Sequence, residues 1–309
     1  MKVLICDPVD KGAVEKMQKA GLTVDNKGGI KPEELLQVVG NYEALVVRSA
    51  TKVTKDVIEK GKNLKIIIRG GVGLDNIDSE AAKKANIKVD NTPEASSVSV
   101  AELTIGMMFC FSRKIAVADA TMKQGKWEKK RLEGTELYKK TLGLIGIGRI
   151  GYEVAKRAIA LEMSVIAYDP YVKPNDPKVT QLGIKMVTLA EVLKNSDFIS
   201  LHIPKTDETK YILNASAFNM MKKTAVIVNC ARGGVVNEKD LADAIKAGTI
   251  AGACVDVYEK EPILPDNPLL TLGEKVVLTP HLGASSVEGQ GRVGGAVADK
   301  LIAYSQTRA

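Results

Sequence analysis

The chain has 309 residues, which is enough for two domains that each enclose a hydrophobic core. Apolar residues make up 45% and charged residues 26%, a balance that excludes a disordered or fibrous chain. The net charge of +7 comes from lysines and arginines dispersed among acids, so we expect no nucleic-acid partner, and the mild positive field suits a small anionic substrate.

Cysteine spacing and hydropathy limit the location of the protein. None of the four cysteines lies in a CxxC pair, so we expect neither a disulfide scaffold nor a metal site. The longest helical apolar segment, Leu103–Phe111, is too short to cross a bilayer, and the apolar run at the N-terminus is too short for a signal peptide. We therefore expect a cytoplasmic protein with no membrane partner.

The first part of the chain alternates apolar runs with polar stretches of helical periodicity. The predicted strands are Val3–Cys6, Ala44–Arg48, Leu64–Ile68 and Ile87–Val89. The predicted helices are Lys11–Ala20, Pro32–Val39, Lys55–Lys60 and Ser79–Ala85. Continuous apolar strands between helices indicate a parallel sheet that is covered on both faces.

A helical segment, Ser97–Lys123, leads to a second series of strands and helices. The six predicted strands are Thr141–Ile145, Ser164–Tyr168, Phe198–Leu201, Ala225–Asn229, Gly252–Val257 and Val276–Thr279. The helices between them are Ile150–Leu161, Leu189–Lys194, Ala215–Met221 and Glu238–Ala247. This order predicts a doubly wound nucleotide-binding sheet. We expect a last helix, Val293–Tyr304, to pack back on the first domain and make it discontinuous.

A glycine-rich turn follows the first strand of the second series and opens a helix. Gly146 permits the tight turn, Gly148 lets a pyrophosphate approach the backbone, and Gly151 lets helix and strand pack closely. Asp169 ends the next strand near the expected spacing, where it would accept hydrogen bonds from ribose hydroxyls and repel a 2′-phosphate. The signature predicts NAD, rather than NADP, as cofactor.

Three strand ends in the second series each carry one chemically competent side chain: the cation Arg232, the carboxylate Glu261 and the imidazole of His281. An arginine that binds an anion, together with a histidine backed by a carboxylate, can move a proton to or from a 2-hydroxy acid. Each residue alone is more often structural. Their order, their positions after strands and the cofactor signature together favour the catalytic interpretation, with Arg232 on the substrate carboxylate and Glu261 orienting His281.

These phrases resemble the D-isomer-specific 2-hydroxyacid dehydrogenases, above all the branch that oxidises D-3-phosphoglycerate. The resemblance covers nearly the whole chain and includes the segments Arg48–Thr54, Arg69–Asp78, Asn91–Pro93, Gly125–Glu128, Gly134–Leu137, Asn229–Gly234, Asp256–Pro262 and Pro280–Ala284. It implies an α/β protein with two doubly wound parallel-sheet domains. A Rossmann NAD domain, residues 97–283, is inserted in a discontinuous flavodoxin-like substrate domain, residues 1–96 and 284–309. It also implies a cleft between the domains and a homodimer built on the NAD domain.

The resemblance assigns roles residue by residue. Arg232, Glu261 and His281 match the catalytic set, with Glu261 preferred to Glu259 because the family's acid stands directly before a proline. The residues implied for the cofactor are Val72, Gly146, Gly148, Arg149, Ile150, Gly151, Asp169, His202, Pro204, Cys230, Ala231, Arg232, Asp256, His281 and Gly283. Those implied for the substrate are Arg48, Ser49, Arg69, Gly71, Val72, Gly73, Arg232 and His281.

The implied reaction is the oxidation of D-3-phosphoglycerate to 3-phosphohydroxypyruvate, which serves serine biosynthesis. A phosphorylated substrate needs further cations, for which Arg48 and Arg69 are the candidates; the cluster Lys129–Arg131 could add charge from a partner subunit. The longer family members carry a serine-sensing domain, and we expect none here and no inhibition by serine. A glyoxylate, hydroxypyruvate or D-lactate type reductase and an NAD-sensing interaction protein are the alternatives.

Overall fold

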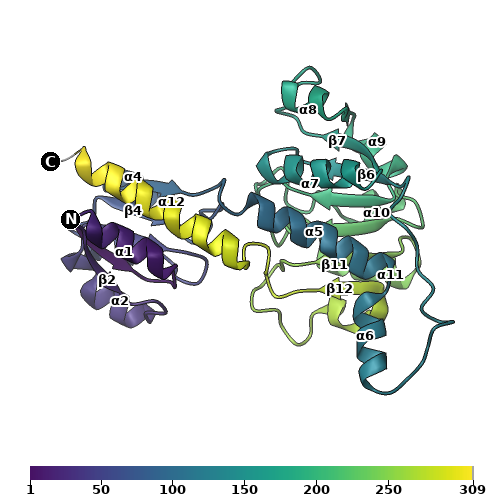
Figure 1. The fold of residues 1–309 in the computed structure, drawn as a ribbon, viewed down its shortest axis with the longest axis horizontal. Helices are drawn as coiled ribbons and strands as arrows, with labels where there is room; N and C mark the ends of the chain where they lie inside the picture. The colour runs from purple at the N-terminus through teal and green to yellow at the C-terminus, as the bar shows by residue number, and fades with distance from the viewer. Residues whose placement is uncertain (308–309) are drawn as a thin grey trace. The chain divides into compact units, whose positions relative to one another are not determined.

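The computed structural model describes residues 1–307 and divides the chain into two compact units (Figure 1). The first unit holds Met1–Ser97 and the chain from Ala284 onward, and the second holds Val98–Gly283. Each unit is a wholly parallel sheet with helices on both faces, five strands in the first and seven in the second. The predicted fold class, two doubly wound α/β domains, is confirmed.

The first unit has the strand order β2-β1-β3-β4-β5, the flavodoxin-like order. Its strands are β1 (Lys2–Ile5), β2 (Thr23–Asn26), β3 (Ala44–Val47), β4 (Ile66–Arg69) and β5 (Lys88–Asn91). Its helices are α1 (Lys11–Lys19), α2 (Pro32–Val38), the 3-10 turn η1 (Val39–Asn41), α3 (Lys55–Lys60), α4 (Ser79–Lys84) and α12 (Val287–Gln306). The last helix returns to the sheet that the N-terminal segment builds.

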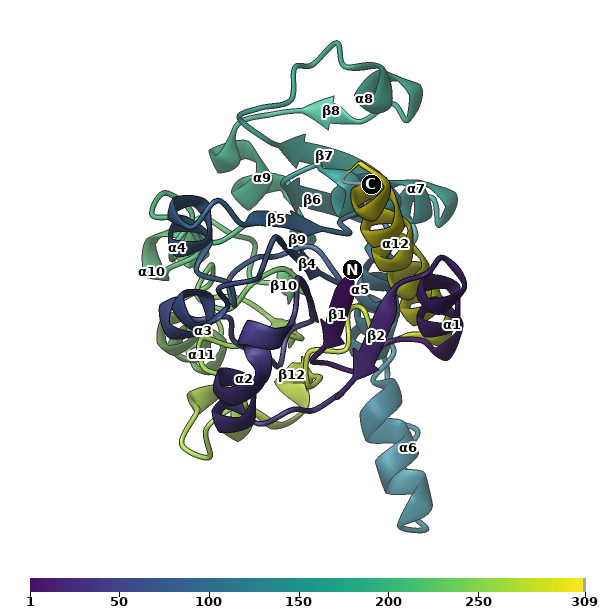
Figure 2. The same cartoon turned by 90° about the vertical axis from the view of Figure 1, so that its left-hand side faces the viewer.

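Alternate residues of the central strands separate the core of the first unit into two layers. Leu45 and Val47 of β3 pack under α2, α3 and α4, whereas Ala44 and Val46 pack under α1 and α12. Helices α1 and α12 lie side by side in both views (Figures 1 and 2). Gly294 permits this approach, because a Cβ there would lie 3.0 Å from the Cβ of Ala13.

The second unit has the strand order β8-β7-β6-β9-β10-β11-β12, a Rossmann sheet extended by one strand. Its strands are β6 (Thr141–Ile145), β7 (Ser164–Tyr168), β8 (Lys185–Met186), β9 (Phe198–Leu201), β10 (Val226–Asn229), β11 (Gly252–Val255) and β12 (Val276–Leu278). Its helices are α5 (Ser97–Ser112), α6 (Ile115–Lys123), α7 (Arg149–Ala160), α8 (Pro177–Gln181), α9 (Leu189–Asn195), α10 (Ala215–Asn219), α11 (Glu238–Lys246) and the 3-10 turns η2 (Pro268–Thr271) and η3 (Gly273–Lys275).

Two apolar layers fill the second unit. One joins α5 and α7 to a face of the sheet, and the other joins α9, α10 and α11 to the opposite face. The central strands β9, β10 and β11 are buried along their whole length, which explains why their sequences read as unbroken apolar runs. Their carboxyl ends all meet one edge of the sheet, where the candidate residues stand.

Strands β2 and β8, and the interruption between helices α5 and α6, were not predicted from the sequence. Strands β2 and β8 lie at sheet edges and are partly exposed and polar, so they lack the apolar signal of the central strands. The segment predicted as one helix is two, because Lys114 takes a left-handed backbone (φ 52°) between α5 and α6. Helix α6 buries none of its residues and stands away from the sheet (Figure 2).

The last helix begins at Val287, earlier than expected, because the Ser286 side chain caps it by accepting the N–H of Gly289. Several glycines in its first turns concealed this start in the sequence. Across residues 1–307, no helix combines the length and apolar character that crossing a membrane requires.

Candidate active site

The glycine-rich turn lies at the point where the strand order of the second unit reverses, between β6 and β9. Gly146 has φ 92°, and a Cβ there would lie 2.7 Å from the carbonyl oxygen of His202. A Cβ on Gly151 would lie 2.5 Å from the carbonyl oxygen of Gly146. Gly148, at the N-terminus of α7, faces open space instead. The turn therefore offers backbone N–H groups and a positive helix end to an approaching diphosphate.

Asp169 follows β7 and is joined to this turn. One carboxylate oxygen accepts the N–H of Ile147 at 3.0 Å, and the other accepts the N–H of Tyr171 at 2.9 Å. Each oxygen retains a lone pair, so ribose hydroxyls remain possible donors. The first hydrogen bond fixes the carboxylate beside the loop that would hold the diphosphate.

The ring of His202 lies beneath the same turn, with a Cβ on Gly151 only 3.6 Å from its Cδ2. Its Nε2 lies 2.9 Å from Ser200 Oγ, and its Nδ1 is buried without a hydrogen-bond partner among residues 1–307. Burial lowers the pKa of His202 to about 3, so the ring is neutral. His202 thus supports the turn and is not equipped for acid–base work.

The loop that carries Arg232 is shaped by a residue that sequence reasoning overlooked. Asn229, buried at the end of β10, accepts the N–H of Ala231 at 3.1 Å and donates to the carbonyl oxygen of Arg232 at 3.0 Å. The guanidinium of Arg232 donates to the carbonyl oxygen of Ala231 at 2.7 Å. An asparagine as the last residue of an apolar strand was the available signal.

Glu261 and His281 form a pair, with 2.7 Å between Glu261 Oε2 and His281 Nδ1. Burial raises the pKa of Glu261, but hydrogen bonds from His281 and the N–H of Tyr258, with the charge of Arg232, outweigh it and leave the pKa lowered. The ionised carboxylate requires a proton on Nδ1, which leaves Nε2 for a substrate. His281 is 42% exposed, so a ligand can reach its ring.

A buried carboxylate holds the backbone around His281. Asp256, wholly buried after β11, accepts the hydroxyl of Thr279 at 2.5 Å and the N–H groups of Leu282 at 2.7 Å and Gly283 at 2.9 Å. Its carbonyl oxygen accepts the N–H of His281. These bonds stabilise the left-handed backbone of His281 (φ 57°), which a non-glycine residue seldom adopts.

In the first unit, a buried carboxylate likewise holds the backbone of the loop after β3 by hydrogen bonds. The buried carboxylate of Asp7 accepts the N–H of Arg48 at 2.5 Å and the hydroxyl of Thr51 at 2.8 Å. The guanidinium of Arg48 donates to the side-chain oxygen of Gln290 and, at 3.4 Å, to the carbonyl oxygen of Pro8. Burial lowers the pKa of Arg48, partly offset by the charge of Asp7.

Arg69 ends β4, the strand beside β3, and its guanidinium lies over Gly71. A Cβ on Gly71 would meet Arg69 Nη1 at 1.8 Å, and one on Gly70 would meet Arg48 Cγ at 3.4 Å. The two arginine loops are therefore in contact. The backbone of Gly71 is held by Thr92, whose hydroxyl accepts its N–H at 2.8 Å.

The other predicted residues differ in what their side chains can offer. Cys230 is buried against Met107, and burial raises its pKa to about 12, so the thiol stays protonated. Pro204 is exposed. The remaining members of the set are placed as follows: Arg149 and Ile150 in the first turn of α7, Ala231 buried beside Arg232, Gly283 against Asp256, and Ser49, Val72 and Gly73 in the loops of the first unit.

Arg131, a member of the cluster considered as a source of charge for a partner subunit, donates to Glu128 at 2.6 Å and to Glu274 at 3.0 Å within its own chain. Within residues 1–307, no three histidine, cysteine or acidic side chains gather in a way that could hold a metal ion.

Comparison with known proteins decides the family. The model described as "D-isomer specific 2-hydroxyacid dehydrogenase, NAD binding domain" matches residues 105–283, more than half of the chain. The chain belongs to this family. The resemblance inferred from the strand-end phrases is therefore confirmed, and the glycine-rich turn lies in the family's NAD binding domain.

Two curated relatives share the sequence to the same degree but differ in length. D-3-phosphoglycerate dehydrogenase of Archaeoglobus fulgidus is 49% identical over 302 residues, which is 98% of this chain and 57% of that protein. Hydroxypyruvate reductase of Thermotoga maritima is 49% identical over 304 residues, which is 97% of both chains. The chain thus spans little more than half of the first relative and nearly all of the second.

Among solved structures, the NAD-dependent formate dehydrogenase of Staphylococcus aureus in complex with NAD aligns with a TM-score of 0.87. It is 27% identical, and the alignment covers 100% of this chain and 97% of that chain. The chain is therefore similar in fold to a structure solved with NAD bound.

Proposed function

We propose that this protein is an NAD-dependent dehydrogenase that oxidises D-3-phosphoglycerate to 3-phosphohydroxypyruvate, the entry to serine biosynthesis. The observation that carries the proposal is the 2.7 Å pair between His281 and Glu261, with the charge of Arg232 acting on the same carboxylate. An imidazole oriented by an ionised acid beside a cation is suited to proton transfer on an anionic 2-hydroxy acid.

In the proposed reaction, NAD supplies the acceptor for the hydride of substrate C2. Nε2 of His281 takes the hydroxyl proton as the C2 carbonyl forms, and Glu261 stabilises the imidazolium that results. Arg232 holds the substrate carboxylate, a charge-assisted contact worth about 1.5–3 kcal/mol. In the reverse direction the imidazolium returns the proton to the oxygen.

The proposed cofactor site consists of the residues that the family resemblance assigned, centred on the turn at Gly148 and on Asp169. The open face of Gly148 fits a diphosphate, and the carboxylate of Asp169 would repel the 2′-phosphate of NADP. We therefore propose NAD as the preferred cofactor. A higher kcat/KM with NADP than with NAD would contradict this choice.

Arg48 and Arg69 are the proposed ligands for the phosphate of the substrate. Arg48 is half-buried, and its guanidinium donates to a neutral amide and a backbone carbonyl. A phosphate could replace these neutral acceptors with a stronger, charge-assisted partner.

Hydroxypyruvate reductase is the second candidate, because the Thermotoga maritima relative of that name matches along 97% of both chains. Steady-state kinetics in the direction of reduction separate the two. We expect NADH oxidation with 3-phosphohydroxypyruvate at a higher kcat/KM than with hydroxypyruvate or glyoxylate. The opposite order would favour the second candidate, and NAD binding without turnover of any of these acids would favour an NAD-sensing protein.

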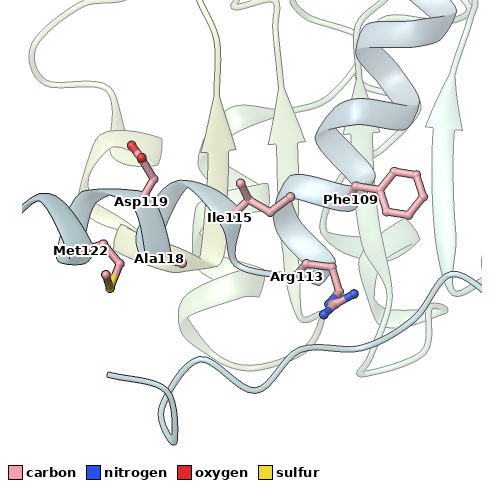
Figure 3. Close-up of a pocket in the computed structure, with 6 residues that line it drawn as sticks. All are labelled: Phe109, Arg113, Ile115, Ala118, Asp119 and Met122. Atoms are coloured by element: carbon pink, nitrogen blue, oxygen red, sulfur yellow. The ribbon is translucent and has the colours of Figure 1, made fainter. Parts of the chain in front are cut away.

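A homodimer is proposed from the surface that α5 and α6 present. Figure 3 shows the side chains along this surface: Phe109, Arg113, Ile115, Ala118, Asp119 and Met122. Ile115 and Met122 are 51% and 53% exposed on a helix that buries no residue of its own. A second copy of the chain would cover this apolar surface. Light scattering should give twice the chain mass, and Ile115→Asp with Met122→Asp should give the monomer.

We also propose that the protein works in the cytoplasm. All four cysteines are free thiols in the structure, and Cys6, Cys230 and Cys254 are buried. Free thiols are the usual state of cysteine in a reducing compartment.

A further inference from the structure

The loop that carries Glu261 is attached to the first turn of α11 by an exchange of hydrogen bonds. Glu238, the first residue of α11, accepts the N–H of Glu259 at 2.5 Å through Oε1. In return, Glu259 Oε1 accepts the N–H of Glu238 at 3.2 Å. Each carboxylate thus accepts the backbone N–H of the other glutamate, and Glu259 lies two residues before Glu261.

The second oxygen of Glu238 is also committed. Its Oε2 accepts the side-chain N–H of Asn267 at 2.5 Å, and the amide oxygen of Asn267 caps η2 by accepting the N–H of Leu269 at 2.9 Å. Because both ends of the Asn267 amide are used, its orientation is fixed. Glu238 is only 8% exposed, so its carboxylate joins α11, η2 and the Glu261 loop from within.

Close backbone packing supports the same loop from the side of Arg232. A Cβ on Gly233 would lie 1.7 Å from the carbonyl oxygen of Tyr258 and 2.9 Å from the nitrogen of Glu259. Gly233, directly after Arg232, therefore packs against the peptide between Tyr258 and Glu259, whose N–H donates to Glu238. Tyr258 N–H in turn donates to Glu261 Oε1 at 3.1 Å, so the constraint reaches the carboxylate that meets His281.

We propose that Glu238 is a positioning residue for the acid–base pair: its buried carboxylate fixes the loop so that Glu261 meets Nδ1 of His281. This inference rests on the proposed roles of Glu261 and His281. A buried carboxylate is costly to keep, and the burial of Glu238, with the charges of Glu259 and Glu261, raises its pKa despite its hydrogen bonds. The hydrogen bonds that Glu238 accepts from Glu259 and Asn267 offset the cost of burying its carboxylate.

The test is a double-mutant cycle on the reduction of hydroxypyruvate by NADH. Glu238→Ala should lower kcat on the order of ten- to a hundredfold, the effect of a displaced catalytic group. In a Glu261→Ala background, Glu238→Ala should have little further effect, because Glu238 acts through Glu261. Equal factors in both backgrounds would overturn the proposal.

Glu238→Gln keeps the side-chain shape and can still accept the N–H of Glu259. Its amide N–H₂ group would then face the N–H₂ group of Asn267, so the hydrogen bond between these two side chains would be lost. If the alanine variant does not fold, this variant carries the test, with a smaller loss of kcat that again vanishes in the Glu261→Ala background. Wild-type kcat in Glu238→Gln and Glu238→Ala would overturn the inference. His281→Ala separates the two claims, since wild-type activity there would refute the proposed function itself.

Asp197→Asn is the matched control for lost stability. Asp197 precedes β9 at the amino edge of the same sheet and accepts the N–H of Thr141 and the ammonium of Lys222, both at 2.9 Å. Its replacement should destabilise the second unit without changing kcat. If it lowered kcat as much as Glu238→Ala does, the effect would be one of general stability and the proposal would fail.

Discussion

Two loops of this protein are built alike, and we propose different roles for them. After β3 in the first unit, the buried carboxylate of Asp7 holds the loop of Arg48; after β11 in the second unit, the buried carboxylate of Asp256 holds the segment of His281. The difference lies in what the functional side chain touches. His281 already meets its charged partner Glu261, whereas Arg48 donates to neutral oxygens of Gln290 and Pro8.

The contrast suggests a division of labour, in which the second unit would provide proton transfer and the first unit would select the substrate. In the second unit the chain itself brings Glu261 and His281 together, so the acid–base chemistry that we propose for them would be the same for any bound 2-keto acid. In the first unit Arg48 donates to neutral acceptors, and we propose that the phosphate of a substrate replaces them, so that the contribution of Arg48 depends on the substrate.

The largest effect should come from His281→Ala, which removes the group that we propose as proton donor and acceptor. We expect kcat to fall by about 10²–10⁴-fold for phosphorylated and unphosphorylated substrates alike. Steady-state assays with both substrates check this, with the exposed Asp243→Ala on α11 as the surface control. A loss confined to one substrate would mean that His281 serves recognition instead of proton transfer.

Asp256→Asn should have a smaller effect of the same kind. An amide places an N–H₂ group against the backbone N–H of Leu282 or Gly283, so one hydrogen bond is lost inside a buried site. We expect a loss of about 1–3 kcal/mol in the free energy of unfolding, with a drop in kcat on the order of tenfold as His281 shifts. Urea unfolding together with kinetics checks both. A variant with lower stability and unchanged kcat would show that Asp256 does not position His281.

The smallest effect concerns the pH dependence of stability at Glu238. Its pKa is raised in the folded state by burial and by the neighbouring Glu259 and Glu261, with Tyr211 and Tyr258 also close. The folded protein therefore binds this proton more tightly than the unfolded chain, and stability falls as pH rises through the window above the ordinary value of 4.5.

Glu238→Gln removes that titration. The free energy of unfolding of the wild type, minus that of Glu238→Gln, should decline as pH rises from 4 and level off above the raised pKa. Unfolding in urea across this range measures the difference. A difference that increases with pH would contradict the raised pKa and the buried environment from which it follows.

The sequence predicted the parts of this protein that repeat a simple pattern. Buried central strands read as apolar runs, and the strand-end motifs pointed to the Glu261 and His281 pair, which the structure brings within hydrogen-bond distance. Edge strands such as β8 escaped, because partly exposed positions carry no apolar signal. Glu238 escaped for another reason: it binds the backbone N–H of Glu259, 21 residues away, and no local pattern records such a contact. Asn229 differs, because it bonds Ala231 and Arg232 nearby in the chain, and its position at the end of an apolar strand was a usable signal.

We propose that side chains of the second unit carry out the reaction and that Arg48 of the first unit selects the phosphorylated substrate. The most direct measurement is kcat/KM of Arg48→Ala for 3-phosphohydroxypyruvate and for hydroxypyruvate. We predict a loss on the order of ten- to a hundredfold for the phosphorylated acid, the value of a charge-assisted contact, and little change for the other. Equal losses for both acids, or none for either, would contradict the claim.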